Sequence, residues 1–222
     1  MQAVGRSPIE ICIRMIDRLA HCRIPGLLNV FQYVDPYLLV WEPFVFTLFE
    51  AQVIMRHIPE REVAQNLWPV LECLRFLRDQ SRELASLTPR DILFTEEGEL
   101  EIAGVENSRQ IDTSQADALN STFKALRLIV HEMVEEHGSG FSWSEEFRGF
   151  KSALARSTSG RCLDDLMRAV TWHGMLDTGV PVHIAVVISK EYASLIPACI
   201  DLSSLYVDPL YLRDNIAELK PD

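Results

Sequence analysis

The sequence lacks long apolar segments. No hydrophobic run approaches the length of a membrane-spanning helix, and the run at residues 184–188 is only strand-sized. Residues 1–10 contain no apolar core of the kind that marks a secretory signal peptide. We therefore expect an intracellular protein, cytoplasmic or nuclear, with no membrane partner.

Basic residues are also scarce. Lys and Arg number 21 against 32 Asp and Glu, which gives a formal net charge of -11. Nucleic acids and anionic lipids are polyanions and repel such a chain, and no Lys/Arg cluster offsets this charge. The composition therefore predicts that the chain does not bind nucleic acid.

Metal-binding patterns are weak, and we expect no cofactor. The five cysteines are odd in number and widely spaced, which favours buried, reduced thiols over a disulfide or zinc framework. His131 and Glu132 begin a stretch similar to the zinc-protease motif H-E-x-x-H, but Glu135 replaces the second histidine. We interpret this stretch as a solvated helix face.

The N-terminal half predicts a helix, two strands and a longer helix. Ser7, Pro8 and Glu10 form the pattern of a capping box, and apolar residues recur behind it at helical spacing: Ile9, Cys12, Ile13, Ile16, Leu19 and Ala20. Residues 28–34 and 37–41 have the composition of short strands, separated by an Asp-Pro turn. A helix over residues 59–78 follows, with a kink expected at Pro69.

The remainder predicts a hairpin and then mostly helices. In residues 91–103, Ile92 and Phe94 should face Leu100 and Ile102 across a turn at Gly98. Three helices follow with buried faces, and the tail adds a strand at 182–188 and a last helix at 209–219. This order predicts an α+β fold with its helices gathered toward the C-terminal side.

Several stretches occur in the same order as segments of the protein-kinase family. Residues 21–24 (HCRI) resemble its H-P-N-I segment, residues 89–93 (PRDIL) its P-E-N-I-L, residues 98–103 (GELEIA) its G-x-x-K-I-A, and residues 125–133 (ALRLIVHEM) its S-L-G-x-x-x-x-E-M. The match covers roughly residues 7–175. Each stretch is short, and the sequential order carries the resemblance.

The resemblance implies a reduced kinase-like fold. The first helix is similar to the family's C helix, with Glu10 at the place of its glutamate, and the two strands are similar to its fourth and fifth. Glu42, Pro43 and Phe44 fall at the hinge, where the family's backbone binds adenine. The expected organisation is a kinase-like domain over 1–176, with a residual N-lobe (1–45) and a helical C-lobe (46–176), and a C-terminal extension over 177–222.

The departures from the family pattern remove its catalytic groups. The glycine-rich loop and its following lysine have no counterpart, because only six residues precede Ser7. Ser86 stands in place of the catalytic aspartate and Thr88 in place of the catalytic-loop lysine, and a serine hydroxyl is too weak a base. Gly104 replaces the magnesium-binding aspartate, and Thr122 replaces the aspartate that anchors the catalytic loop.

Asp91 and Glu106 are the only candidates for a metal ligand at these positions. Asp91 replaces the family's metal-binding asparagine, and Glu106 ends the triplet that replaces D-F-G. Two carboxylates without a phosphate make a poor Mg²⁺ site, so we expect no metal and interpret Asp91 as a cap at the start of the hairpin.

The resemblance and its departures together predict a catalytically inactive, pseudokinase-like scaffold or binding protein. It should have a protein partner and should not bind ATP. Two alternatives remain open: a divergent ATP-dependent phosphotransferase whose missing parts come from another chain, and a fragment of a longer kinase.

Overall fold

The computed structural model describes residues 8–32, 37–54, 58–115, 118–135, 142–157 and 161–170. All of them belong to the first of the two units into which the chain divides, Met1–Ala185 and Val186–Asp222. Within these residues the fold is mixed α+β, with six α-helices and small antiparallel sheets. This confirms the predicted class. The predicted tail elements at 182–188 and 209–219 and the Ser7–Glu10 capping box lie outside the part that the structure describes.

The first elements are helix α1 (Pro8–Arg18) and an antiparallel hairpin of β1 (Leu27–Gln32) and β2 (Tyr37–Trp41). On the predicted apolar stripe of α1, Ile16 and the following Leu19 are buried, whereas Cys12 and Ile13 are only half-buried. Ala20 is exposed, contrary to prediction, because the helix ends at Arg18 and the chain has already turned away.

A second sheet forms the middle of the described structure. β5 (Ile92–Phe94) pairs with β6 (Leu100–Ile102), and Ile92 lies opposite Ile102 as predicted. The turn places Gly98 at a φ of 80°, a conformation that glycine adopts without strain. The other edge of β5 pairs with the short strand β3 (Phe46–Thr47). Helix α2 (Leu48–Ile54) follows β3 directly.

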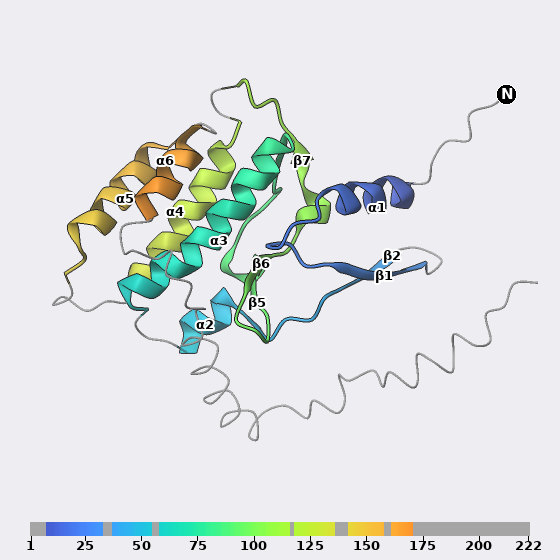
Figure 1. Ribbon diagram of the computed structural model, residues 1–222, viewed down its shortest axis with the longest axis horizontal. Coiled ribbons are helices and arrows are strands. Elements are labelled where there is room, and N and C mark those ends of the chain that lie inside the picture. The colour runs from blue at the N-terminus through green and yellow to red at the C-terminus, as the bar shows by residue number, and fades with distance from the viewer. Residues whose placement is uncertain are drawn as a thin grey trace, which may run out of the picture. The chain divides into compact units, whose positions relative to one another are not determined.

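Four helices supply most of the buried core. They are α3 (Glu60–Asp79), α4 (Asn120–Glu135), α5 (Glu145–Arg156) and α6 (Arg161–Val170). Each of the four buries one apolar face, as predicted, including Leu67 and Leu71 on α3, Phe147 and Phe150 on α5, and Leu166 on α6. Pro69 lies inside α3, and the helix continues across it. Figure 1 shows these helices side by side, with the β5–β6 hairpin between them and the β1–β2 hairpin.

Short elements complete the fold. β4 (Arg82–Glu83) pairs with β7 (Arg109–Gln110), and two 3₁₀ helices lie between them in sequence: η1 (Pro89–Asp91) before β5 and η2 (Val105–Asn107) after β6. η2 contacts α1. The β4–β7 pair therefore connects the end of α3 with the segment that precedes α4.

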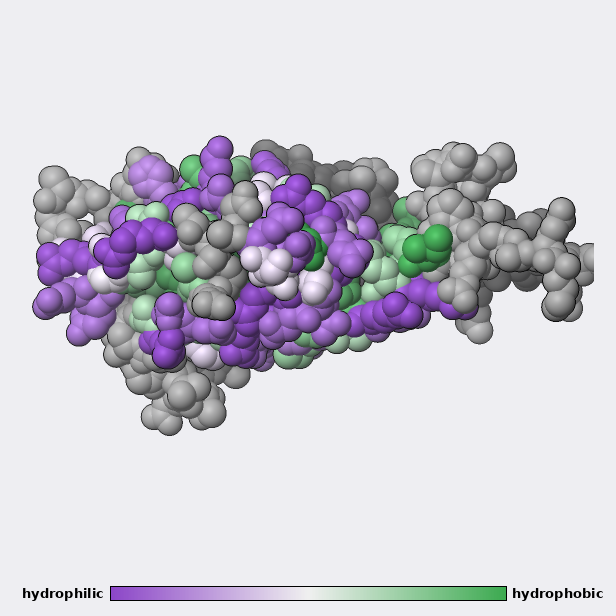
Figure 2. Space-filling model, turned by 90° about the horizontal axis from the view of Figure 1, so that it is seen from above, coloured by the Kyte–Doolittle hydropathy of each residue, from purple (hydrophilic) through white to green (hydrophobic). Residues whose placement is uncertain are grey.

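Surface polarity differs along the described part. Figure 2 shows mostly hydrophilic residues over the helices, and hydrophobic residues toward the end where α1 and the β1–β2 hairpin lie. None of the helices that the structure describes is long and apolar enough to cross a membrane.

Candidate functional site

A cavity of about 630 Å³ lies where β2 runs into the segment before β3. Its apolar wall comes from β2 and its neighbours (Pro25, Leu39, Val40, Trp41, Pro43, Phe44) and from the sheet and η2 side (Leu93, Ala103, Val105). The charged groups of the lining belong to Glu42, Glu106 and Arg90. The size is that of small-molecule sites in proteins, which are typically about 300–1,000 Å³.

The cavity brings together residues that the sequence placed in two separate motifs. Glu42, Pro43 and Phe44, predicted to resemble a nucleotide hinge, line it together with Gly104 and Glu106. Ser86, Thr88 and Asp91 are not among the lining residues, although Arg90 between them is. Only part of the predicted site therefore converges at the cavity.

Glu42 is tied to Gly26. The Gly26 N–H donates to Glu42 Oε2 at 2.7 Å, and the Glu42 N–H donates back to the Gly26 carbonyl at 2.9 Å. A Cβ on Gly26 would lie 2.8 Å from the Glu42 carboxylate, so a larger residue there would displace the end of the Glu42 side chain. Pro43 has no N–H to donate. The backbone at 42–43 therefore offers no free donor to a ligand.

Asp91 is used as a cap. Its Oδ2 accepts from the Thr88 N–H at 2.7 Å and from the Thr88 hydroxyl at 2.8 Å, and the two residues form a capping box around η1. This confirms the interpretation of Asp91 as a cap. The predicted substitute for the catalytic-loop lysine, Thr88, takes part in the same turn.

Glu106 and Gly104 face the cavity from η2 and its start. The Asn107 amide donates to Glu106 Oε1 at 3.0 Å. Burial, followed by the nearby charge of Glu106, raises the pKa of the Cys12 thiol on α1. Gly104 has a φ of 84°, and a Cβ there would meet no atom within 4 Å. Among the residues that the structure describes, no group of three His, Cys, Asp or Glu side chains is arranged to hold a metal ion.

Arg90 was not singled out from the sequence. It lines the cavity, and its guanidinium lies 3.9 Å from the ring centroid of Phe49 on α2, a cation–π contact. Trp41, Leu39 and Leu93 were also missed as site residues, because each has the apolar strand character of an ordinary core residue.

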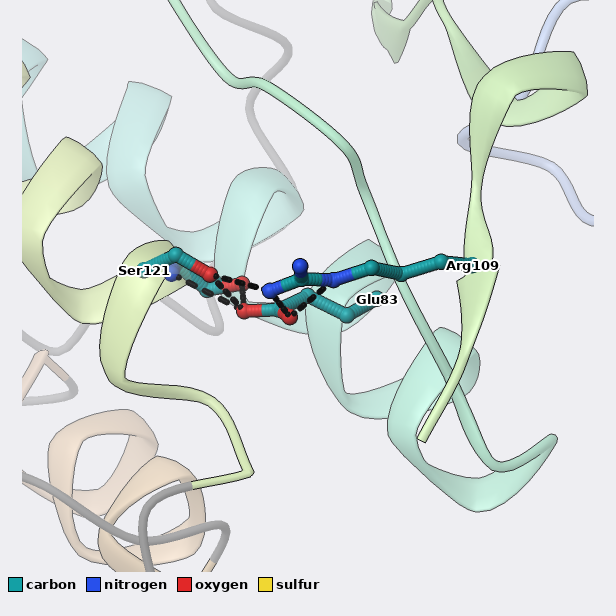
Figure 3. Close-up of polar contacts among 4 residues, drawn as sticks. Glu83, Arg109 and Ser121 are labelled. Atoms are coloured by element: carbon teal, nitrogen blue, oxygen red, sulfur yellow. Dashed lines mark hydrogen bonds and ion pairs between the residues drawn. The ribbon is translucent and has the colours of Figure 1, made fainter. Parts of the chain in front are cut away.

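A second polar cluster lies between β4, β7 and the N-terminus of α4 (Figure 3). The Glu83 side chain is fully buried. Its Oε1 accepts from the Ser121 hydroxyl at 2.5 Å, the Thr122 hydroxyl at 2.8 Å and the Thr122 N–H at 3.1 Å. Its Oε2 accepts from Arg109 Nε at 3.0 Å and Nη2 at 2.6 Å.

These contacts set the ionisation of Glu83. Burial by itself raises the pKa of a carboxyl group, but the hydrogen bonds from Ser121, Arg109 and Thr122 outweigh it, and the pKa of Glu83 is lowered. No feature of the sequence joined Glu83 to Arg109 and Thr122, which follow it by 26 and 39 residues.

No protein-family model matches the chain, and no curated protein matches it.

Proposed function

We propose that this protein is a catalytically inactive, protein-kinase-like binding or scaffold protein. The observation that carries the proposal is the composition of the cavity. The residues that resemble a hinge line it together with those at the D-F-G positions, as expected for that resemblance, and the groups needed for phosphoryl transfer are replaced.

Chemistry at the cavity argues against phosphoryl transfer. The reaction needs a clamp on the phosphates, a bound metal and a base beside the attacking hydroxyl. Among the described residues no lysine lines the cavity, and Gly104 offers no carboxylate. The Asp91 carboxylate already accepts two hydrogen bonds from Thr88. Ser86 is exposed in the loop before η1 and carries only a hydroxyl.

The hydrogen bonds around Glu83 are a second, independent support for an inactive role. Active kinases use an aspartate on their F helix to anchor the catalytic loop, and Thr122 falls at that position. Here Glu83 supplies the carboxylate from β4, and Thr122 supplies the donors. Relative to active kinases, the carboxylate and the hydrogen-bond donors have exchanged places. The contact maintains the structure of this region, although a catalytic carboxylate is absent from it.

A binding role is supported by exposed apolar residues in the segment that follows the cavity-lining residue Glu42. Eight large hydrophobic residues are exposed in the described part, and four of them fall within ten positions: Phe44, Val45, Phe49 and Val53. We call these four the 44–53 patch. The proposal takes these four residues as one contact surface, since exposed apolar residues that lie together mark protein–protein contacts.

Nucleotide titration tests the inactive role. ATP with Mg²⁺ should leave the melting temperature unchanged into the millimolar range, because only a ligand that binds the native state raises it. Radiolabelled ATP should give no transfer to the chain or to generic substrates. A melting temperature that rises steadily with ATP–Mg²⁺, or any stoichiometric transfer, contradicts the proposal.

Photo-crosslinking tests the binding role. A photoreactive residue at Val53, which is 69% exposed, should yield a discrete protein adduct in cells. The same residue at Arg148, an exposed position on α5, is the control and should yield none. Equal labelling from both positions would show that the 44–53 patch is not a contact surface.

A further inference from the structure

The cavity has features of a ligand site that do not depend on any likeness to kinases. Its volume exceeds what a few waters need, and the lining residue Gly104 leaves space open, because an added Cβ would meet no atom within 4 Å. Trp41 and Leu39 bring flat and branched apolar surfaces from β2, and Leu93 faces them from β5. A planar aromatic molecule fits such walls, since it loses apolar surface to both sides.

The charges at the cavity favour a cation. Glu42 and Glu106 place two carboxylates on the wall against the single guanidinium of Arg90. The Arg90 guanidinium lies over the ring of Phe49, which is not a lining residue, so its charge is already partly engaged. An anion in the cavity would be repelled by both carboxylates. It would be attracted only by Arg90, whose charge already interacts with Phe49.

The environment behind the cavity wall is also negative. Glu101 on β6 is half-buried, and one of its carboxylate oxygens has no hydrogen-bond partner. Burial and then the charges of Glu42 and Glu97 raise the pKa of Glu101, and the opposing charge of Arg23 offsets only part of this effect. The field from this group adds to that of Glu42 and Glu106.

We infer that the cavity binds a planar aromatic molecule with one positive charge. Trp41 supplies the aromatic face, which attracts a cation through its π-electrons, and Glu106 supplies the counter-charge. A polyphosphate finds no lysine and a single arginine among the lining residues. This inference goes beyond the proposed inactive role, because it depends on the cavity alone.

Two acridines of opposite charge test the inference directly. Proflavine is a planar acridine cation, and acridine carboxylate is an anion built on the same rings. Titrated against the full chain at neutral pH, proflavine should bind with one-to-one stoichiometry and on the order of tenfold more tightly than acridine carboxylate. Equal affinity, tighter binding of the anion, or no saturable binding of proflavine overturns the inference.

Charge substitution locates the effect. Glu106→Gln should weaken proflavine about fivefold and leave acridine carboxylate unchanged or slightly tighter. Glu132→Gln removes the same charge from an exposed position on α4, outside the lining, and should leave both affinities unchanged. If the two variants behave alike, the cation does not lie beside Glu106 and the inference is wrong.

Filling the cavity gives an independent readout. Ala103→Leu adds a branched side chain to the lining and should reduce proflavine binding at least about tenfold by occupying its space. Ala155→Leu makes the same change on the exposed face of α5 and should have no effect. Full proflavine binding by a folded Ala103→Leu protein places the dye elsewhere and overturns the inference.

The two proposals fail separately. Loss of the proflavine preference leaves the inactive binding role untouched, because that role does not require a small ligand. Phosphate transfer from ATP would overturn the inactive role, whereas the acridine comparison would still decide whether the cavity selects cations.

Discussion

At the scale of single residues, Glu83 has the most demanding position in the described structure. Its carboxylate is removed from water and accepts hydrogen bonds from Arg109, Ser121 and Thr122. Removing a buried carboxylate that accepts several hydrogen bonds leaves their donors without a partner, and this lowers the free energy of unfolding substantially. Arg109 is different, because its side chain is 61% exposed and can turn to water.

We therefore predict unequal costs for the two partners. Glu83→Ala should lower the free energy of unfolding by about 3 kcal/mol, the range found when a buried ion pair loses one member. Arg109→Ala should cost only about 1 kcal/mol, because Ser121 and Thr122 continue to satisfy Glu83. Urea unfolding of both variants measures this order. Equal losses would mean that Arg109 is the main partner of the buried charge.

The same residue makes stability depend on pH. The pKa of Glu83 is lower in the folded protein, so its contribution is complete above its unfolded pKa of about 4.3 and is lost as the pH falls through the folded pKa. The stability difference between wild type and Glu83→Gln should therefore shrink from neutral pH to roughly pH 3. Unfolding curves at several pH values measure it. A constant difference would show that the Glu83 carboxyl does not titrate below its unfolded pKa.

At the scale of elements, the long amphipathic helices and the β5–β6 hairpin were predictable. Leu126 and Met133 on α4, or Leu163 and Leu166 on α6, repeat at the helical period because each helix buries one face. The turn at Gly98 fixed the register of the hairpin. These signals are local, so one sequence is enough to find them.

Helix α2 was missed although a local signal was present. Thr47 and Glu50 form a capping box in which the Thr47 N–H donates to Glu50 Oε2 at 2.7 Å, and the Glu50 N–H donates to Thr47 Oγ1 at 3.3 Å. The T-x-x-E spacing was visible in the sequence, but apolar residues surround it and hide the helical period.

The two-residue strands β3, β4 and β7 had no local signal. Each exists because a partner strand distant in sequence pairs with it, as Phe46 does with Phe94. The candidate site shows the same difference between local and tertiary signals. The order of the motifs was enough to predict Glu42, Gly104 and Glu106 as site residues. The roles of Arg90 and Glu83 follow from tertiary contacts that one sequence does not specify.

The start of α5 supplies a prediction about an element. The Ser144 hydroxyl accepts from the Phe147 N–H at 3.1 Å, and Ser144 also bonds Glu60 at the start of α3. Ser144→Ala removes the cap and should cost about 1 kcal/mol. Ser152→Ala, an exposed change within the same helix, should be neutral or slightly stabilising. Chemical unfolding compares them, and equal effects would show that the cap contributes nothing.

At the scale of the whole molecule, the β1–β2 hairpin and α1 are sparsely covered in the described part. β1 and β2 form a two-stranded sheet there, and Leu28, Leu38 and Ile11 are each more than half exposed. Cys12 and Ile13 on the apolar stripe of α1 are only half-buried. A two-stranded ribbon with open edges is marginal in water and accepts a further strand readily.

Two sources can supply the missing cover: another molecule, or the C-terminal part of this chain. Residues 182–188 (VHIAVVI) have the length and β-branched content of a strand that adds to an open edge. We favour the intramolecular source, because the entropy of closing a loop grows only slowly with its length.

We predict that deleting residues 177–222 exposes the hairpin and causes dimerisation or aggregation, visible by light scattering, together with a lower melting temperature. If the tail is the source of the cover, the deletion leaves these apolar residues open to water, and the strand edges pair between molecules. A shorter deletion, residues 190–222, retains the 182–188 segment and should stay monomeric at the wild-type melting temperature. If the longer deletion is also monomeric and melts unchanged, the tail does not cover the hairpin, and an outside partner remains as the source of that cover.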